Sequence, residues 1–150
     1  MKLLFKENYL AFIKNSDKTK AFANVWAMVG KQRKDLTQGG KLSCAYFVSS
    51  VLKIFGLIKE VHLTVSGTLN DMQKSGWFEI KDTKAGAVLL WEKKRGHYHL
   101  GFYLGKNLAI SNNSKTKDIR KHHFTYQGKR KIIKIFWHNK LDEEKNRNKK

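Results

Sequence analysis

The sequence predicts one α+β domain, with helices in its first half and an antiparallel sheet in its second. Apolar residues recur at helical spacing up to about residue 74, and from about residue 87 they alternate with polar ones. No proline, repeat or linker divides the 150 residues, and the 41% hydrophobic content is enough for a folded core. We expect the domain over residues 1–138 and a charged, disordered tail over 139–150.

The first two segments are read from their apolar spacing. Residues 1–16 predict a short amphipathic lead-in. Residues 18–32 predict a helix, because apolar side chains recur every three or four positions, at Phe22, Val25, Trp26 and Val29. Gly39–Gly40 then interrupt the pattern and separate this segment from the next.

The strongest helix signal is "SCAYFVSSVLKIFG", from Ser43 to Gly56. Serine is a favoured N-cap and glycine a favoured C-terminal stop. Cys44 lies in the first turn of the apolar face, which continues through Val48, Val51, Leu52 and Phe55. A third, shorter helix is expected over about residues 68–74, closed by Gly76.

Four segments predict strands by continuous or alternating apolar residues: 87–91, 97–105, 107–111 and 131–138. In "HYHLGFYLG" (97–105) the large apolar residues point to one face, and His97, His99 and Gly101 point to the other. Gly105 with Lys106 predicts a tight hairpin turn to the following strand.

The net charge of +19, mostly from lysine, favours anionic partners such as nucleic acid, acidic membrane surfaces or anionic wall polymers. A lysine-rich composition on a solvated surface explains the same charge without any partner. Charged residues interrupt every apolar run near the N-terminus, so no signal peptide is recognisable and no run is long enough for a membrane span. We expect a protein that stays in the cytoplasm or is exported by a route that the sequence does not show.

Cys44 is the single cysteine, which excludes an internal disulfide. At a helix start its sulfur is expected near unpaired backbone N–H groups and the positive end of the helix dipole, which favour the thiolate. The alternative is a small apolar filler, because free cysteines are often buried.

A cysteine nucleophile needs a base oriented by a third polar group. His97 and His99 share a polar strand face, which Gly101 leaves unobstructed. A histidine on a strand is often only structural, and an H-x-H pair is also a metal-binding pattern, although no third ligand lies at suitable spacing. The other four histidines carry no catalytic signal: His62, His122, His123 and His138. His122 and His123 fall in a predicted basic loop.

The blocks "SCAYFVSSVLKIFGL", "KAGAVLLW" and "HLGFYLG", between about Gly39 and Ser111, resemble the three motif blocks of NlpC/P60 cysteine peptidases, which are related to CHAP amidases. The resemblance implies a papain-like fold, with helices packed on an antiparallel sheet. It implies Cys44 as the nucleophile and His99 as the histidine that opens the final block. It further implies hydrolysis of amide bonds in bacterial cell-wall (peptidoglycan) peptides through a thioacyl-enzyme, without metal or organic cofactor.

The third polar residue of the family, usually histidine, falls at Ser111. Alternation along the strand sends Ser111 to the face opposite Ile110, where its hydroxyl can accept a hydrogen bond from the base. Asn112 and Asn113 are the substitutes if the strand ends early. The alternative is that all three are ordinary turn residues.

The sequence departs from the family around the nucleophile. The family's D-C-S-G is replaced by Ser-Cys-Ala-Tyr, and an aspartate of the second block is replaced by Ala87. Tyr46 and His97 are expected as candidate substrate-site residues. The competing hypothesis is a non-catalytic module that binds polyanions on the same fold. An enzyme requires Cys44 and His99 to share an open cleft, whereas a binding module does not.

We expect the net charge to drive a salt-sensitive association with polyanions. Binding to heparin, nucleic acid or a teichoic-acid-like polymer, measured at increasing ionic strength, should weaken steeply and show no sequence preference. If the protein ignores all three polymers at low salt, the charge is compositional bias only.

Overall fold

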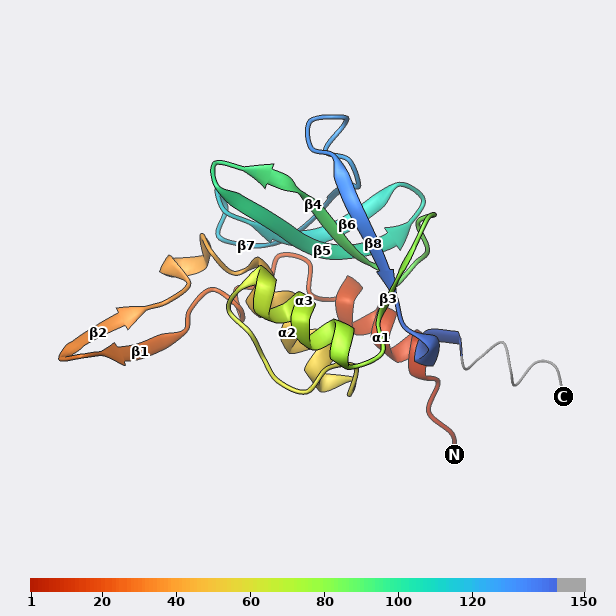
Figure 1. Ribbon diagram of the computed structural model, residues 1–150, viewed down its shortest axis with the longest axis horizontal. Helices are drawn as coiled ribbons and strands as arrows, with labels where there is room; N and C mark the ends of the chain where they lie inside the picture. The colour runs from red at the N-terminus through yellow and green to blue at the C-terminus, as the bar shows by residue number, and fades with distance from the viewer. Residues whose placement is uncertain (143–150) are drawn as a thin grey trace, which may run out of the picture.

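The computed structural model describes residues 1–142, which form a six-stranded antiparallel sheet with three α-helices on one face (Figure 1). The helices are α1 (Phe5–Lys14), α2 (Cys44–Ile54) and α3 (Val65–Lys74). The sheet strands are β3 (Phe78–Ile80), β4 (Val88–Lys94), β5 (His97–Gly105), β6 (Leu108–Asn113), β7 (Asp118–His123) and β8 (Ile132–Trp137). Their order across the sheet is β3-β8-β4-β5-β6-β7, and the predicted α+β architecture is confirmed.

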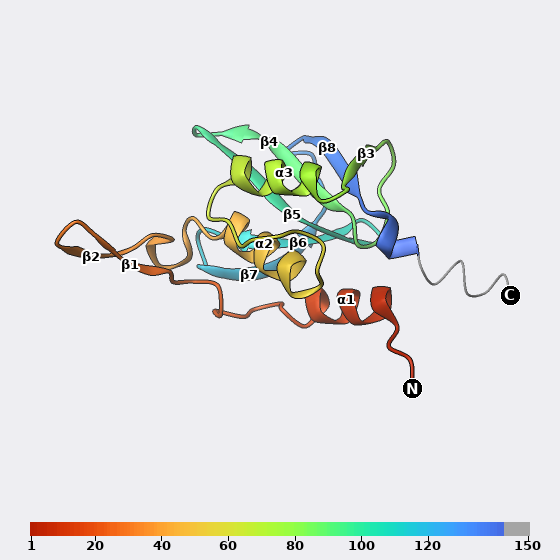
Figure 2. The ribbon, with the colours of Figure 1, turned by 60° about the horizontal axis from the view of Figure 1, so that its bottom comes forward.

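The main core lies between the helices and the central strands. Figure 2 shows α2 between α1 and α3. Buried residues of α2 pack against the inward-facing residues of the sheet, the larger of which are Leu100, Phe102 and Ile110. The rings of Phe47 and Phe102 meet edge to face at 5.5 Å. Each such side chain contributes roughly 1.5–3 kcal/mol on full burial, so this contact fixes α2 against β5.

A second, smaller cluster lies on the opposite face of the sheet. Leu89, Trp91, Tyr103 and Ala109 form its buried centre. These residues alternate with the core residues on the same strands, as the period of two predicted for β5 requires. His99 and Ser111 belong to this face, because each lies an even number of positions from a member of the cluster.

The prediction of a helix over residues 18–32 is wrong. That segment contains turns and irregular backbone, followed by a two-stranded hairpin, β1 (Trp26–Val29) and β2 (Gln32–Asp35), which stands away from the rest of the chain in Figure 1. The turn passes through Gly30, whose φ of +62° suits glycine. Of the two segments before Gly39–Gly40, only the predicted lead-in over residues 1–16 contains an α-helix, α1.

The base of the hairpin is held by one carboxylate, that of Asp35. Asp35 accepts hydrogen bonds from the backbone N–H of Val25 at 2.9 Å and of Gly39 at 2.8 Å. On the hairpin itself, the guanidinium of Arg33 lies 4.1 Å from the ring centre of Trp26.

The sheet contains two strands that the sequence pattern did not predict. β3 has only three residues, and β7 occupies the segment around His122 and His123 that was predicted as a basic loop. The β5–β6 turn is formed by Lys106 and Asn107, one residue later than predicted, and Leu108 is exposed rather than buried. The other predicted strands are confirmed within three residues at each end.

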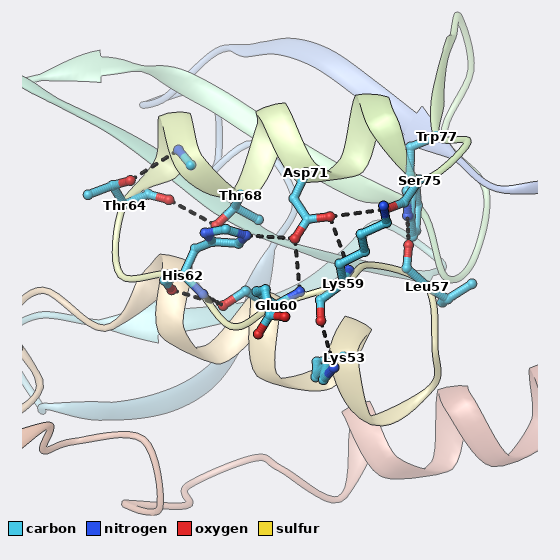
Figure 3. A network of polar contacts seen from close by, with 12 residues as sticks. Lys53, Leu57, Lys59, Glu60, His62, Thr64, Thr68, Asp71, Ser75 and Trp77 are labelled. Carbon is cyan, nitrogen blue, oxygen red and sulfur yellow. Dashed lines mark hydrogen bonds and ion pairs between the residues drawn. The ribbon is translucent and has the colours of Figure 1, made fainter.

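The loop between α2 and α3 is tied to α3 by the carboxylate of Asp71 (Figure 3). Its two oxygens accept hydrogen bonds from the backbone N–H groups of Lys59 and Glu60 and lie close to Ser75 Oγ and His62 Nε2. Burial raises the pKa of Asp71, but these donors together lower it below its usual value. The His62–Asp71 pair thus takes part in the contacts that tie the loop to α3.

Part of the predicted tail is ordered. Residues Asn139–Asp142 form a 3₁₀ turn in which Leu141 is buried. Residues 143–150, the rest of the predicted tail, lie outside the described residues. No helix within residues 1–142 has the length and apolar character to cross a membrane.

Candidate functional site

Cys44 is the first residue of α2, and the loop before it is fixed against the sheet. Asn112 Nδ2 donates a hydrogen bond of 2.7 Å to the backbone carbonyl of Gly40. Gly40 has a φ of +108°, and a Cβ there would lie 2.6 Å from the backbone oxygen of Lys117. A glycine is thus required for the close approach that sets the start of α2 beside β6 and β7.

Ser43 occupies the N-cap position as predicted, but its side chain does not cap the helix. Its hydroxyl is buried and has no hydrogen-bond partner among the described residues. The Cys44 sulfur instead interacts with the backbone N–H groups of Leu100, Ala45 and Cys44 itself. Leu100 directly follows His99, so the thiol lies against the strand that carries the predicted base.

The predicted stabilisation of the Cys44 thiolate is outweighed in this structure. Burial raises the pKa of the thiol above its ordinary 9.0, although the backbone N–H of Leu100 and the positive charge of Arg130 lower it in part. The resting sulfur is therefore a neutral thiol near pH 7.

His99 lies half-buried on β5, against the indole of Trp91 at a ring-centre distance of 5.3 Å. Burial lowers its pKa to about 3, with further contributions from the positive charge of Arg130 and from His122. The ring is consequently neutral near pH 7. One of its nitrogens, Nε2, lies 2.9 Å from Ser111 Oγ.

Ser111 is 1% exposed and its hydroxyl has three partners. Besides His99 Nε2, these are His122 Nε2 at 2.7 Å and the hydroxyl of Tyr126 at 3.1 Å. The rings of His122 and Tyr126 stack at 4.1 Å. The contact between His99 and Ser111 agrees with the predicted position of the third polar residue, while its catalytic role stays a prediction.

Gly101 makes this arrangement possible. A Cβ at Gly101 would lie 2.7 Å from Ser111 Cβ and 2.9 Å from the ring of Trp91. Both distances are shorter than real Cβ contacts, so any side chain here displaces the residues around His99. The expectation that Gly101 leaves the histidine face unobstructed fits this packing.

The side chains of the other two candidates for the third polar residue have other partners. The side chain of Asn112 holds the loop before Cys44, and Asn113 Oδ1 accepts hydrogen bonds from the turn that follows it, so neither substitutes for Ser111. His97 is exposed at the start of β5, and Tyr46 is half-buried on α2 beside Phe22. Their predicted roles in substrate binding are untested by these contacts.

His122 and Tyr126 are the site residues that sequence reasoning missed. The segment of β7 shows no apolar alternation that would have revealed a strand, and Tyr126 lies in the turn after it. Within residues 1–142, no group of three histidine, cysteine or acidic side chains is arranged to hold a metal ion.

A surface groove of about 690 Å³ lies next to this network, on the side of the sheet away from the helices. It is lined by residues of the 81–83 and 124–132 segments, among them Arg130, and by Ile135. Neither Cys44 nor His99 lines it, so we place the candidate chemistry outside this groove.

Comparison with known proteins supports the fold. NlpC2 from Trichomonas vaginalis superposes with a TM-score of 0.55 and 15% sequence identity, over 90% of this chain and 47% of that one. The chain thus spans about half the length of that protein. No protein-family model and no curated protein sequence matches the chain. The chain has an NlpC/P60-like α+β fold, in agreement with the resemblance of its motifs.

The low pKa of His99 predicts a loss of stability in mild acid. The pKa of His99 is about 3 in the folded protein and 6.5 in the unfolded chain. Between these pH values only the unfolded chain is protonated at His99, so the free energy of unfolding decreases as the pH falls through 6.5. From pH 7 to pH 5 one such histidine costs about 2 kcal/mol.

Urea unfolding at pH 7 and pH 5 measures this cost. The His99→Gln variant should lose that much less stability than the wild type on acidification. His97→Gln removes an exposed histidine from the same strand and should behave as the wild type. An identical pH dependence in all three proteins would show that His99 is not held neutral.

Proposed function

We propose that the protein is a cysteine hydrolase that cleaves amide bonds, with Cys44 as nucleophile and His99 as base. The observation that carries the proposal is the placement of Cys44 at the start of α2, with its sulfur near the backbone N–H of Leu100, the residue that follows His99 in β5. His99 is in turn held through Nε2 by Ser111, an order of groups that cysteine hydrolases use. The NlpC/P60-like fold adds support.

The proposed reaction begins with attack of the Cys44 sulfur on the carbonyl carbon of the substrate amide. The thiol proton passes to His99 Nδ1, and the carbonyl oxygen becomes an oxyanion near the backbone N–H groups at the start of α2. His99 then gives this proton to the leaving amine, and the C–N bond breaks to leave a thioester on Cys44. Water, deprotonated by His99, hydrolyses the thioester and restores the thiol.

Both groups are neutral in the substrate-free site, because burial raises the pKa of Cys44 and lowers that of His99 to about 3. Proton transfer therefore accompanies the attack rather than preceding it. The neighbouring charge of Arg130 favours the thiolate but disfavours a positively charged His99.

We propose peptides of bacterial peptidoglycan, or related amides, as the substrate. The proposal rests on the motif blocks around Cys44 and His99 and on the fold. The net charge of +19 is compatible with an anionic wall polymer, because the two attract over a Debye length.

The test is incubation of the protein with purified peptidoglycan and with simple peptide amides, followed by mass spectrometry of the products. Cys44→Ala should abolish cleavage, and His99→Ala should lower turnover by about 100-fold or more. Ser50→Ala makes a comparably small change on the same helix and should cleave normally.

Cleavage that survives in Cys44→Ala would contradict the proposal. No cleavage of any amide by the folded wild type, together with salt-sensitive polymer binding, would favour a non-catalytic binding module instead.

A further inference from the structure

The proton positions around Ser111 follow from what each partner can donate. His122 Nδ1 lies 2.8 Å from the backbone carbonyl of His123, and a carbonyl oxygen can only accept. Nδ1 of His122 therefore carries a proton. If the ring is neutral, its Nε2 is bare and can only accept, and the donor facing it at 2.7 Å is the Ser111 hydroxyl.

The surroundings of His122 keep its ring neutral. Its ionisable neighbours are His99 on β5, the adjacent His123 and Tyr126 in the following turn. None of these is a carboxylate that would stabilise a positive ring. Burial lowers the pKa of His122 more than the hydrogen bond to the His123 carbonyl raises it.

A serine hydroxyl has one proton and two lone pairs. Once the proton of Ser111 points to His122, its oxygen can only accept from the remaining partners. The Tyr126 hydroxyl donates from 3.1 Å, and His99 Nε2 donates from 2.9 Å. His99 thus carries its proton on Nε2, and its other ring nitrogen, Nδ1, keeps a free lone pair.

We propose that His122 is a positioning residue, which acts through the Ser111 hydroxyl to hold the proton of His99 on Nε2 and leave Nδ1 free to accept the Cys44 proton. Without an acceptor at His122, the Ser111 proton can turn toward His99 Nε2. The His99 proton then moves to Nδ1, and the ring can no longer act as the base. The consequence for catalysis rests on the proposed function, whereas the tautomer itself does not.

The relay also compensates for the weak polarity of serine. A hydroxyl that donates to a second acceptor becomes a better acceptor itself, because hydrogen bonds in a chain polarise one another. Ser111 together with His122 thereby stabilises a transient positive charge on His99 better than an isolated serine. The ring of Tyr126 stacks on the ring of His122, with their centres 4.1 Å apart, and so helps to orient His122.

The test is NMR of the ring nitrogens in ¹⁵N-histidine-labelled full-length protein near neutral pH, where protonated and bare nitrogens differ clearly in chemical shift. In the wild type, His99 should be protonated on Nε2 and His122 on Nδ1. His122→Phe, which keeps a stacking ring but removes the acceptor, should convert His99 to a mixture of tautomers. His122→Gln, whose amide oxygen can accept from Ser111, should restore the wild-type signal.

Tyr126→Phe is the matched control, because it removes a different partner of the same Ser111 oxygen and should leave the His99 tautomer unchanged. A wild-type spectrum with the His122 proton on Nε2, or the His99 proton on Nδ1, overturns the inference without any variant. An unchanged His99 tautomer in folded His122→Phe overturns it as well. Because the spectra need no substrate, a failure of amide hydrolysis would be recognised separately.

Discussion

The hydrogen bonds of the Ser111 hydroxyl are the interactions on which the rest of the site depends. It is buried, so its hydrogen-bond partners have to come from the protein, and they come from β5, β7 and the turn that follows β7. A buried polar atom without a hydrogen-bond partner destabilises the folded state by roughly 1–3 kcal/mol. The buried Ser111 hydroxyl therefore favours conformations in which its partners stay in contact with it. His99 is oriented as part of this set and not by a single neighbour.

The positions of these strands follow from packing on both faces of the sheet. On one face, α2 packs on β5 and β6 and brings Cys44 to the backbone N–H of Leu100. On the other face, Gly101 allows Trp91 and Ser111 to approach closely enough to enclose His99. The alternation that buries Leu100 in the core turns His99 to the opposite face, and Cys44 of α2 lies near the peptide N–H that joins these two residues. Dry packing also explains why both groups are neutral at rest.

Sequence reasoning succeeded where one local pattern controlled the outcome. The alternation of residues 97–105 identified β5 with its bounds, and the apolar face after Ser43 identified α2. Alternation from Ile110 also placed Ser111 on the face of His99, although Leu108 proved to be exposed.

It failed where contacts that the apolar pattern does not report decide the structure. Asp35 stabilises the hairpin over residues 26–35, although the apolar residues there have helical spacing. The segment of β7 becomes a strand because it pairs with β6. His122 was missed for that reason, since its role exists only across a strand pair. The first-turn position of Cys44 predicted a stabilised thiolate, but burial, which no local pattern reports, has the larger effect.

The most direct measurement of the central claim is detection of a covalent intermediate. A peptide amide substrate is mixed with excess enzyme, the reaction is quenched with acid, and the protein is analysed by intact-mass and peptide-mapping mass spectrometry. A Cys44–His99 hydrolase predicts a transient mass increase equal to the acyl part of the substrate, located on Cys44 and released by hydroxylamine. Product formation without any adduct on Cys44 would contradict it.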